Sequence, residues 1–157
     1  MQSTLLFAML ILSLEMKKNI LKFRLIRLER NGYHPVCSIT INGIKARFVV
    51  DTGASHTVMD LNRIHQFVNA TAIQLNPELS TGLGTSSMQS SMVKIKALEL
   101  DRKTLKNLKM ILLDLSHINN TYQALGFPPI DGVIGTDILN RFKATVSFAT
   151  KTITFNT

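Results

Sequence analysis

"FVVDTGASHTVMD" (residues 48–60) is the most informative stretch of this 157-residue chain. Its three apolar residues lead into Asp51, Thr52 and Gly53, and the chain then becomes polar again. The apolar run predicts a buried strand, so the Asp51 carboxylate stands where an unpaired charge costs on the order of several kcal/mol. Such an acid needs a group that shares its charge, and Gly53 lets a second chain segment approach closely.

The length and composition predict one folded domain. Hydrophobic residues make up 45% of the chain and charged residues 18%, which excludes a disordered protein. The net charge is +8, and the dense basic run outside the N-terminal segment is "DRKTLKNLK" (101–109). That run contains no aromatic residue to stack on a base, so we interpret it as a solvated turn. We expect no nucleic-acid partner.

The cysteine and histidine content argues against metal chemistry. A single cysteine, Cys37, excludes an intrachain disulfide and any paired-cysteine metal or redox site. The four histidines show no metal-ligand spacing: His34, His56, His65 and His117. We therefore predict that the protein has no metal and no cofactor.

The N-terminal segment, residues 1–21, is apolar and then basic. Its run "TLLFAMLILSL" (4–14) is shorter than the roughly 18 residues that span a bilayer, and neither a preceding positive charge nor a small-residue cleavage site marks an export signal. Three interpretations remain: a weak membrane anchor, a degenerate export signal, or a start called too early, with true initiation at Met16. We favour Met16 and a cytoplasmic location, with anchoring or export through residues 4–14 as the alternatives.

From residue 22 onward the pattern is that of short strands. The turn Asn42-Gly43 between two such runs is a strong signal for a β-hairpin. The predicted strands are 22–28, 35–41, 44–50, 91–100, 105–115 and a closing hairpin at 143–155, in which Val146, Phe148, Ile153 and Phe155 alternate. Two short helices are predicted, at 60–68 and 135–142. The sequence thus predicts one mainly β domain, residues 22–157.

An acid placed in this way suits acid–base catalysis by a pair of carboxylates. If a second identical carboxylate comes within about 3 Å, the two cannot both ionise, and they share one proton instead. One carboxylate acts as a general base on water and the other as a general acid on a carbonyl oxygen. "VVDTGAS" (49–55) resembles the active-site signature of the retropepsin-like aspartic proteases, for which this shared-proton pair is known.

A second element strengthens the resemblance. "DGVIGTDIL" (131–139) is similar to the family's apolar-apolar-Gly element before a short helix, here Val133, Ile134 and Gly135. In outline the resemblance covers residue 22 to the end, particularly to bacterial single-domain members. It implies an all-β, mainly β, half-barrel with one or two short helices.

The resemblance also implies the site residues. Asp51 would be the catalytic carboxylate, and Thr52 would hydrogen bond across a dimer to lock two loops together. Gly53 would supply a backbone N–H near the carboxylate. Ala54 and Ser55 would support these residues from the next layer of the site, where Ser55 would orient Asp51.

The chain contains one Asp-Thr-Gly motif, whereas the mechanism needs two. Asp131, the other acid beside a glycine, lacks a following Thr-Gly, and we expect it to be structural. Two-lobed pepsins carry both motifs on a chain of about twice this length, so the resemblance implies a homodimer in which each protomer contributes Asp51.

The mechanism also calls for a flap over an extended peptide or protein substrate. Our candidate is "STGLGTSSMQSS" (80–91), with Thr81, Gly82, Leu83 and Gly84 at its centre; the alternative is a surface loop without substrate contact. Two functions follow. The first is an aspartic endopeptidase, a hydrolase that uses an activated water. The alternative is a catalytically weak dimerisation or peptide-binding module, against which the intact Asp-Thr-Gly argues.

Overall fold

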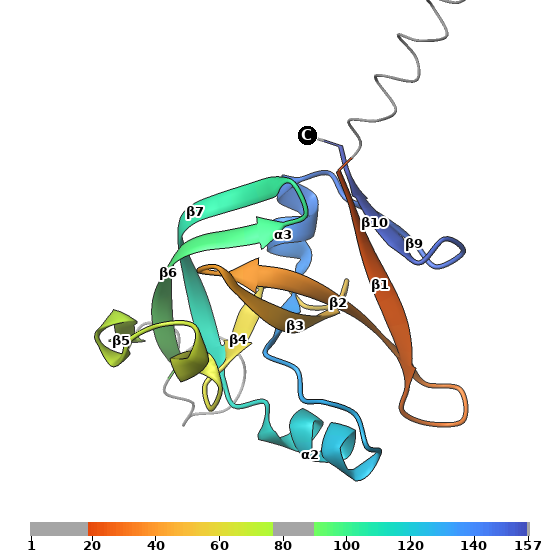
Figure 1. The fold of residues 1–157 in the computed structure, drawn as a ribbon, viewed down its shortest axis with the longest axis horizontal. Helices are drawn as coiled ribbons and strands as arrows, with labels where there is room; N and C mark the ends of the chain where they lie inside the picture. The colour runs from red at the N-terminus through yellow and green to blue at the C-terminus, as the bar shows by residue number, and fades with distance from the viewer. Residues whose placement is uncertain (1–18, 77–89, 157) are drawn as a thin grey trace, which may run out of the picture.

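Strands dominate the computed structural model, which describes residues 19–76 and 90–156 (Figure 1). The strands are β1 (Asn19–Arg27), β2 (Tyr33–Ile41), β3 (Ile44–Val50), β4 (Val58–Asp60), β5 (Ile73–Asn76), β6 (Ser90–Leu100), β7 (Lys103–Leu113), β8 (Gly132–Ile134), β9 (Thr145–Ser147) and β10 (Thr152–Phe155). The helical segments are η1 (Ile64–Gln66), η2 (Ala70–Ala72), α2 (Ser116–Ala124) and α3 (Thr136–Arg141). The predicted all-β class is confirmed.

All the strands belong to one sheet. Its order is β5-β6-β7-β4-β8-β3-β2-β1-β10-β9, and β6 pairs with β2 as well. This additional pairing closes the central strands into a barrel, while β1, β10 and β9 lie together at one side of the molecule (Figure 1). In the parts of the chain that the structure describes, no helix has the length and apolar character needed to cross a membrane. The apolar run at 4–14 lies outside the described residues.

The predicted β2–β3 hairpin is present. Asn42 and Gly43 both have positive φ, 50° and 83°, which a two-residue turn that matches the strand twist requires. The Asn42 side chain also reaches β6, where its Oδ1 accepts the N–H groups of Lys96 and Ala97 at 2.9 and 3.0 Å. The hairpin tip therefore holds the corner at which β6 bends from one side of the barrel to the other.

The central feature of the sheet is the position of β8 between β3 and β4. It runs parallel to β3 and antiparallel to β4, so the segment 51–57 that connects β3 to β4 passes over the end of β8. At Gly132 the three strands come so close that a Cβ atom would lie less than 3.0 Å from the Val58 carbonyl oxygen and from the Phe48 ring. This insertion brings the two sequence motifs together.

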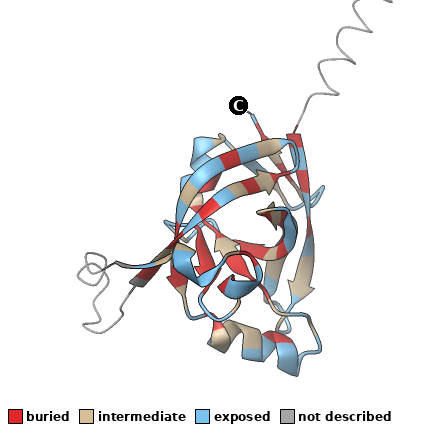
Figure 2. Cartoon of the chain, turned by 60° about the vertical axis from the view of Figure 1, so that its left-hand side comes forward, coloured by how far each residue is buried: buried red, intermediate tan, exposed pale blue. Residues whose placement is uncertain are grey.

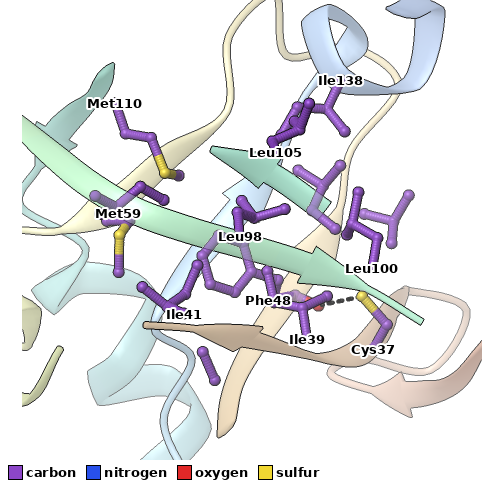
Figure 3. Close-up of a cluster of buried hydrophobic side chains, with 14 of the residues drawn as sticks. Cys37, Ile39, Ile41, Phe48, Met59, Leu98, Leu100, Leu105, Met110 and Ile138 are labelled. Atoms are coloured by element: carbon purple, nitrogen blue, oxygen red, sulfur yellow. Dashed lines mark hydrogen bonds between the residues drawn. The ribbon is translucent and has the colours of Figure 1, made fainter. Parts of the chain in front are cut away.

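Two apolar clusters stabilise the barrel. The larger fills its interior, where Phe48 and Leu98 are fully buried (Figures 2 and 3). Cys37 belongs to this cluster; burial raises the pKa of its thiol to about 12, which leaves it unreactive at neutral pH. The second cluster lies against α2 and consists of Val36, Val49, Leu115, Tyr122 and Ile130.

The structure departs from the expected local structure in three places. The helix expected at 60–68 is the end of β4, a turn and the short η1, because the Asp60 carboxylate accepts the N–H of Asn62 in a turn. Helix α2 was not predicted, since "SHINNTYQA" is polar and buries one side chain, that of Tyr122. Phe148, expected in the closing hairpin, lies just beyond the end of β9; it is 58% exposed and its ring makes an edge contact with that of Phe23 in β1.

We predict that Gly132→Ala lowers the free energy of unfolding by about 3 kcal/mol, because the new methyl group forces the three central strands apart. Urea denaturation monitored by circular dichroism measures this loss. Gly32→Ala is the matched control, since a Cβ there would lie 3.5 Å from its nearest neighbour, Glu29. Equal stability of the two variants would contradict the close packing around β8.

Candidate active site

Asp51 lies where the buried strand β3 ends and the chain reaches the surface. Phe48, Val49 and Val50 are all buried, whereas Asp51 is exposed. The desolvation cost inferred from the sequence is therefore avoided in the single chain. Within the described ranges the carboxylate makes no ion pair, so its charge is open to a group from outside the chain.

Backbone hydrogen bonds hold the loop that carries this acid. The N–H of Gly53 donates to Asp51 Oδ1 at 2.8 Å. The N–H of Asp51 donates to the Ile134 carbonyl of β8 at 3.0 Å, and the N–H of Ala54 to the Asp51 carbonyl at 3.3 Å. The orientation of the carboxylate is thus set by its own turn and by the neighbouring strand.

The apolar-apolar-Gly element supports the same loop from behind. A Cβ atom on Gly135 would lie 2.6 Å from the His56 carbonyl oxygen and 2.9 Å from that of Ala54, so only glycine fits this contact. At the start of α3, Thr136 donates its N–H to the Ala54 carbonyl at 2.8 Å and its hydroxyl to the same oxygen at 3.1 Å. The structure therefore brings the two motifs together.

A carboxylate on α3 fastens the far end of the loop. Asp137 Oδ1 accepts the N–H of buried Thr57 at 2.9 Å and its hydroxyl at 2.6 Å. The Thr57 oxygen in turn accepts the N–H of Gly135 at 3.0 Å. We call these three residues, Thr57, Gly135 and Asp137, the loop clamp. It satisfies three donors that would otherwise be left without partners where the chain is tightly packed.

The roles assigned to Thr52 and Ser55 stay predictions. Both residues are exposed. Among the described residues, neither hydroxyl has a hydrogen-bond partner, whereas the Ser55 carbonyl accepts the Thr136 hydroxyl at 3.5 Å. The flap candidates Thr81 to Gly84 lie outside the described residues, between the antiparallel strands β5 and β6.

The remaining acids near β8 are buried and paired. Asp131 accepts the Nε–H of Arg63 at 2.6 Å and the backbone N–H of Arg47 at 2.8 Å. Asp60 is 1% exposed and accepts hydrogen bonds from Asn119 Nδ2 at 2.9 Å and from the Asn62 N–H at 3.1 Å. Both carboxylates are buried and accept hydrogen bonds from other segments of the chain, whereas that of Asp51 is exposed and accepts one from its own turn.

No metal cluster of three or more histidine, cysteine or acidic residues is present in the described parts of the chain. Sequence reasoning missed Thr57 and Asp137, which stand 80 residues apart. The signal available for Asp137 is an acid in the first turn of a short helix directly behind the apolar-apolar-Gly element. Nothing in the sequence connects it to Thr57.

We predict that Thr57→Val, which keeps the side-chain shape, lowers the free energy of unfolding by about 2 kcal/mol, because the Gly135 N–H loses its acceptor and Asp137 loses a donor. Thr104→Val, on the exposed face of β7, is the control and should change stability by less than about 0.5 kcal/mol. The measurement is urea denaturation at neutral pH. An undiminished midpoint for Thr57→Val would show that the loop clamp contributes nothing.

Solved structures with this arrangement of strands come from several sources. A retropepsin-like aspartic protease from Rickettsia conorii superposes with a TM-score of 0.55 at 19% identity, covering 88% of this chain and 94% of that one. The retroviral protease-like domain of Ddi1 from Leishmania major has a TM-score of 0.53 at 14% identity, covering 77% and 86%. The EIAV protease in complex with the inhibitor HBY-793 has a TM-score of 0.51 at 16% identity, covering 76% and 98%.

These likenesses establish the fold, which is retropepsin-like. A search of curated proteins found no match. A family model described as aspartyl protease matches residues 37–138, a span that contains both the Asp51 loop and the loop clamp. The chain therefore belongs to the aspartyl protease family and has the retropepsin-like fold.

Proposed function

We propose that this protein is an aspartic endopeptidase that works as a homodimer, with Asp51 of each protomer forming the catalytic pair. The observation that carries the proposal is an exposed carboxylate that makes no ion pair with a described residue and is held by the Gly53 N–H on a loop fastened at both ends. A family whose members are peptidases supports the reaction class. The substrate class is an extended peptide or protein segment.

The dimer follows from the count of available acids. The mechanism needs two carboxylates close together, and the sequence holds one Asp-Thr-Gly motif. Asp131 and Asp60 are buried and already have partners. A second copy of Asp51 is therefore the acid that fits, and a twofold axis beside the loop brings it into place. The exposed Thr52 hydroxyl stands beside Asp51 in the loop and is our candidate for the contact that locks the two loops.

The proposed reaction uses the two carboxylates with one shared proton. The ionised member removes a proton from water as the water oxygen attacks the peptide carbonyl carbon, and the protonated member gives its proton to the carbonyl oxygen. The tetrahedral intermediate then collapses: the carboxyl group that took the proton from water gives it to the amide nitrogen, the other carboxylate takes a proton from one of the two hydroxyl groups, the C–N bond breaks, and a carboxylic acid and an amine leave. The N–H of Gly53 keeps each carboxylate oriented during these transfers.

We expect Asp51→Asn to abolish cleavage of a mixed peptide library between pH 4 and 7, because the amide cannot exchange the proton. Asp101→Asn is the matched control and should keep full activity. Asp101 lies at the β6–β7 turn with a φ of 55°, a conformation that asparagine tolerates well, and an amide oxygen can still accept the Ile20 N–H. A dimer verified by sedimentation that cleaves no peptide would favour the alternative, a peptide-binding module.

Subunit mixing tests whether the pair spans two chains. When equal amounts of wild type and Asp51→Asn exchange protomers at random, about a quarter of the dimers contain two wild-type loops. Activity per total protein should then fall to about a quarter of the wild-type value. A monomeric enzyme would keep about half of the wild-type value. Sedimentation of the mixture under the assay conditions is the control that checks whether the protein is dimeric. A value of one half would rule out the shared site.

A further inference from the structure

His34 lies next to the loop that carries Asp51, although 17 positions separate the two residues in the sequence. Strands β2 and β3 are antiparallel, and their last pair at this end is Val36 with Val49. Carried two residues further, the same register puts His34 opposite Asp51. Side chains alternate along a strand, so His34 shares the face of Val36 and Asp51 shares the face of Val49. Those two valines pack in one cluster, which places the imidazole and the carboxylate on the same side of the sheet.

Helix α2 holds the imidazole ring in place. His34 Nδ1 and the Tyr122 hydroxyl oxygen are 3.1 Å apart, and the two ring centroids are 6.0 Å apart. Tyr122 is fully buried and also contacts the Phe127 ring, so it is a rigid support. The other ring nitrogen, Nε2, has no hydrogen-bond partner among the described residues. His34 is half-buried and thus keeps one nitrogen free.

The charges around His34 act in opposite directions. Burial lowers the pKa of His34 below its usual 6.5, and the nearby Asp51 carboxylate opposes this by favouring the imidazolium. The other titratable or charged side chains on this face of the neighbouring elements are Arg24 of β1, which pairs with Val36, Arg47 of β3, and Tyr122, whose pKa is raised by burial against the effect of Arg47. The β1 partner of His34 itself is the apolar Ile26. Asp51 is therefore the acid coupled to His34, and the coupling is reciprocal.

We propose that His34 is a positioning residue of the active site, whose protonated ring keeps the pair of Asp51 carboxylates singly protonated at low pH. The proposal rests on the dimeric site described above. In acid the imidazolium favours the anionic form of the pair, so the second proton binds only at a lower pH. Above its own pKa the ring is neutral and this effect vanishes. His34 thus extends activity towards acid and leaves the alkaline side of the pH profile unchanged.

The first test compares the pH dependence of peptide cleavage by wild type and His34→Gln. Glutamine can still hydrogen bond to Tyr122 but does not titrate. We expect the acid limb to move up by about half a pH unit, as a single charge at several ångströms produces, with the alkaline limb in place. His65→Gln, on the exposed η1, is the control and should move neither limb. An unmoved acid limb in a folded His34→Gln dimer would overturn the proposal.

The second test does not depend on activity. Histidine titration by NMR should show that Asp51→Asn lowers the pKa of His34, because the attracting carboxylate is gone. Unequal pKa values for His34 in the two proteins would support the coupling, whether or not wild type cleaves peptides. Absence of cleavage would count against the proposed function and not against the coupling. Equal values would overturn the role of His34.

Discussion

The rest of the structure depends on the insertion of β8 between β3 and β4 and on the loop clamp that secures it. Two successive strands can lie on either side of a third only if the chain between them crosses the end of that strand. In this protein the crossing segment is 51–57, and it leaves buried N–H and O–H groups that no regular ladder satisfies. The Asp137 carboxylate and the Thr57 hydroxyl oxygen accept hydrogen bonds from these groups. The same crossing gives Asp51 its place, because its N–H is held by β8.

One residue type serves four purposes around this crossing. Asp137 is a structural acceptor for the loop, Asp131 neutralises Arg63, and Asp60 accepts several hydrogen bonds at the end of β4. Asp51 and Asp137 are both exposed, but the Asp137 carboxylate accepts hydrogen bonds from Thr57 at the far end of the loop, whereas the Asp51 carboxylate accepts one from the Gly53 N–H of its own turn. The surroundings of each carboxylate, rather than its residue type, set its role. A carboxylate that already accepts hydrogen bonds from inside the fold is not available to a substrate.

Helix α2 adds a second layer next to the site. Its one buried side chain, Tyr122, packs on the sheet face formed by Val36 and Val49 and reaches His34 with its hydroxyl. Burial of an aromatic ring with a polar tip both stabilises a face of the barrel and orients a titratable group beside the carboxylate. Packing and electrostatics of the proposed site are therefore supported by the same residue, although the helix itself is short and polar.

Local signals in the sequence were sufficient for the longer strands and the Asn42-Gly43 hairpin, and they indicated Asp51 as a candidate, because turn chemistry and strand alternation act over a few neighbouring residues. They were insufficient for α2 and for the turn after Asp60, where one buried side chain or one carboxylate outweighs local preference. The loop clamp and the contact between Tyr122 and His34 were decided by tertiary structure alone. They join residues 80 and 88 positions apart, and hydrogen bonds of that kind exist only once the sheet has formed.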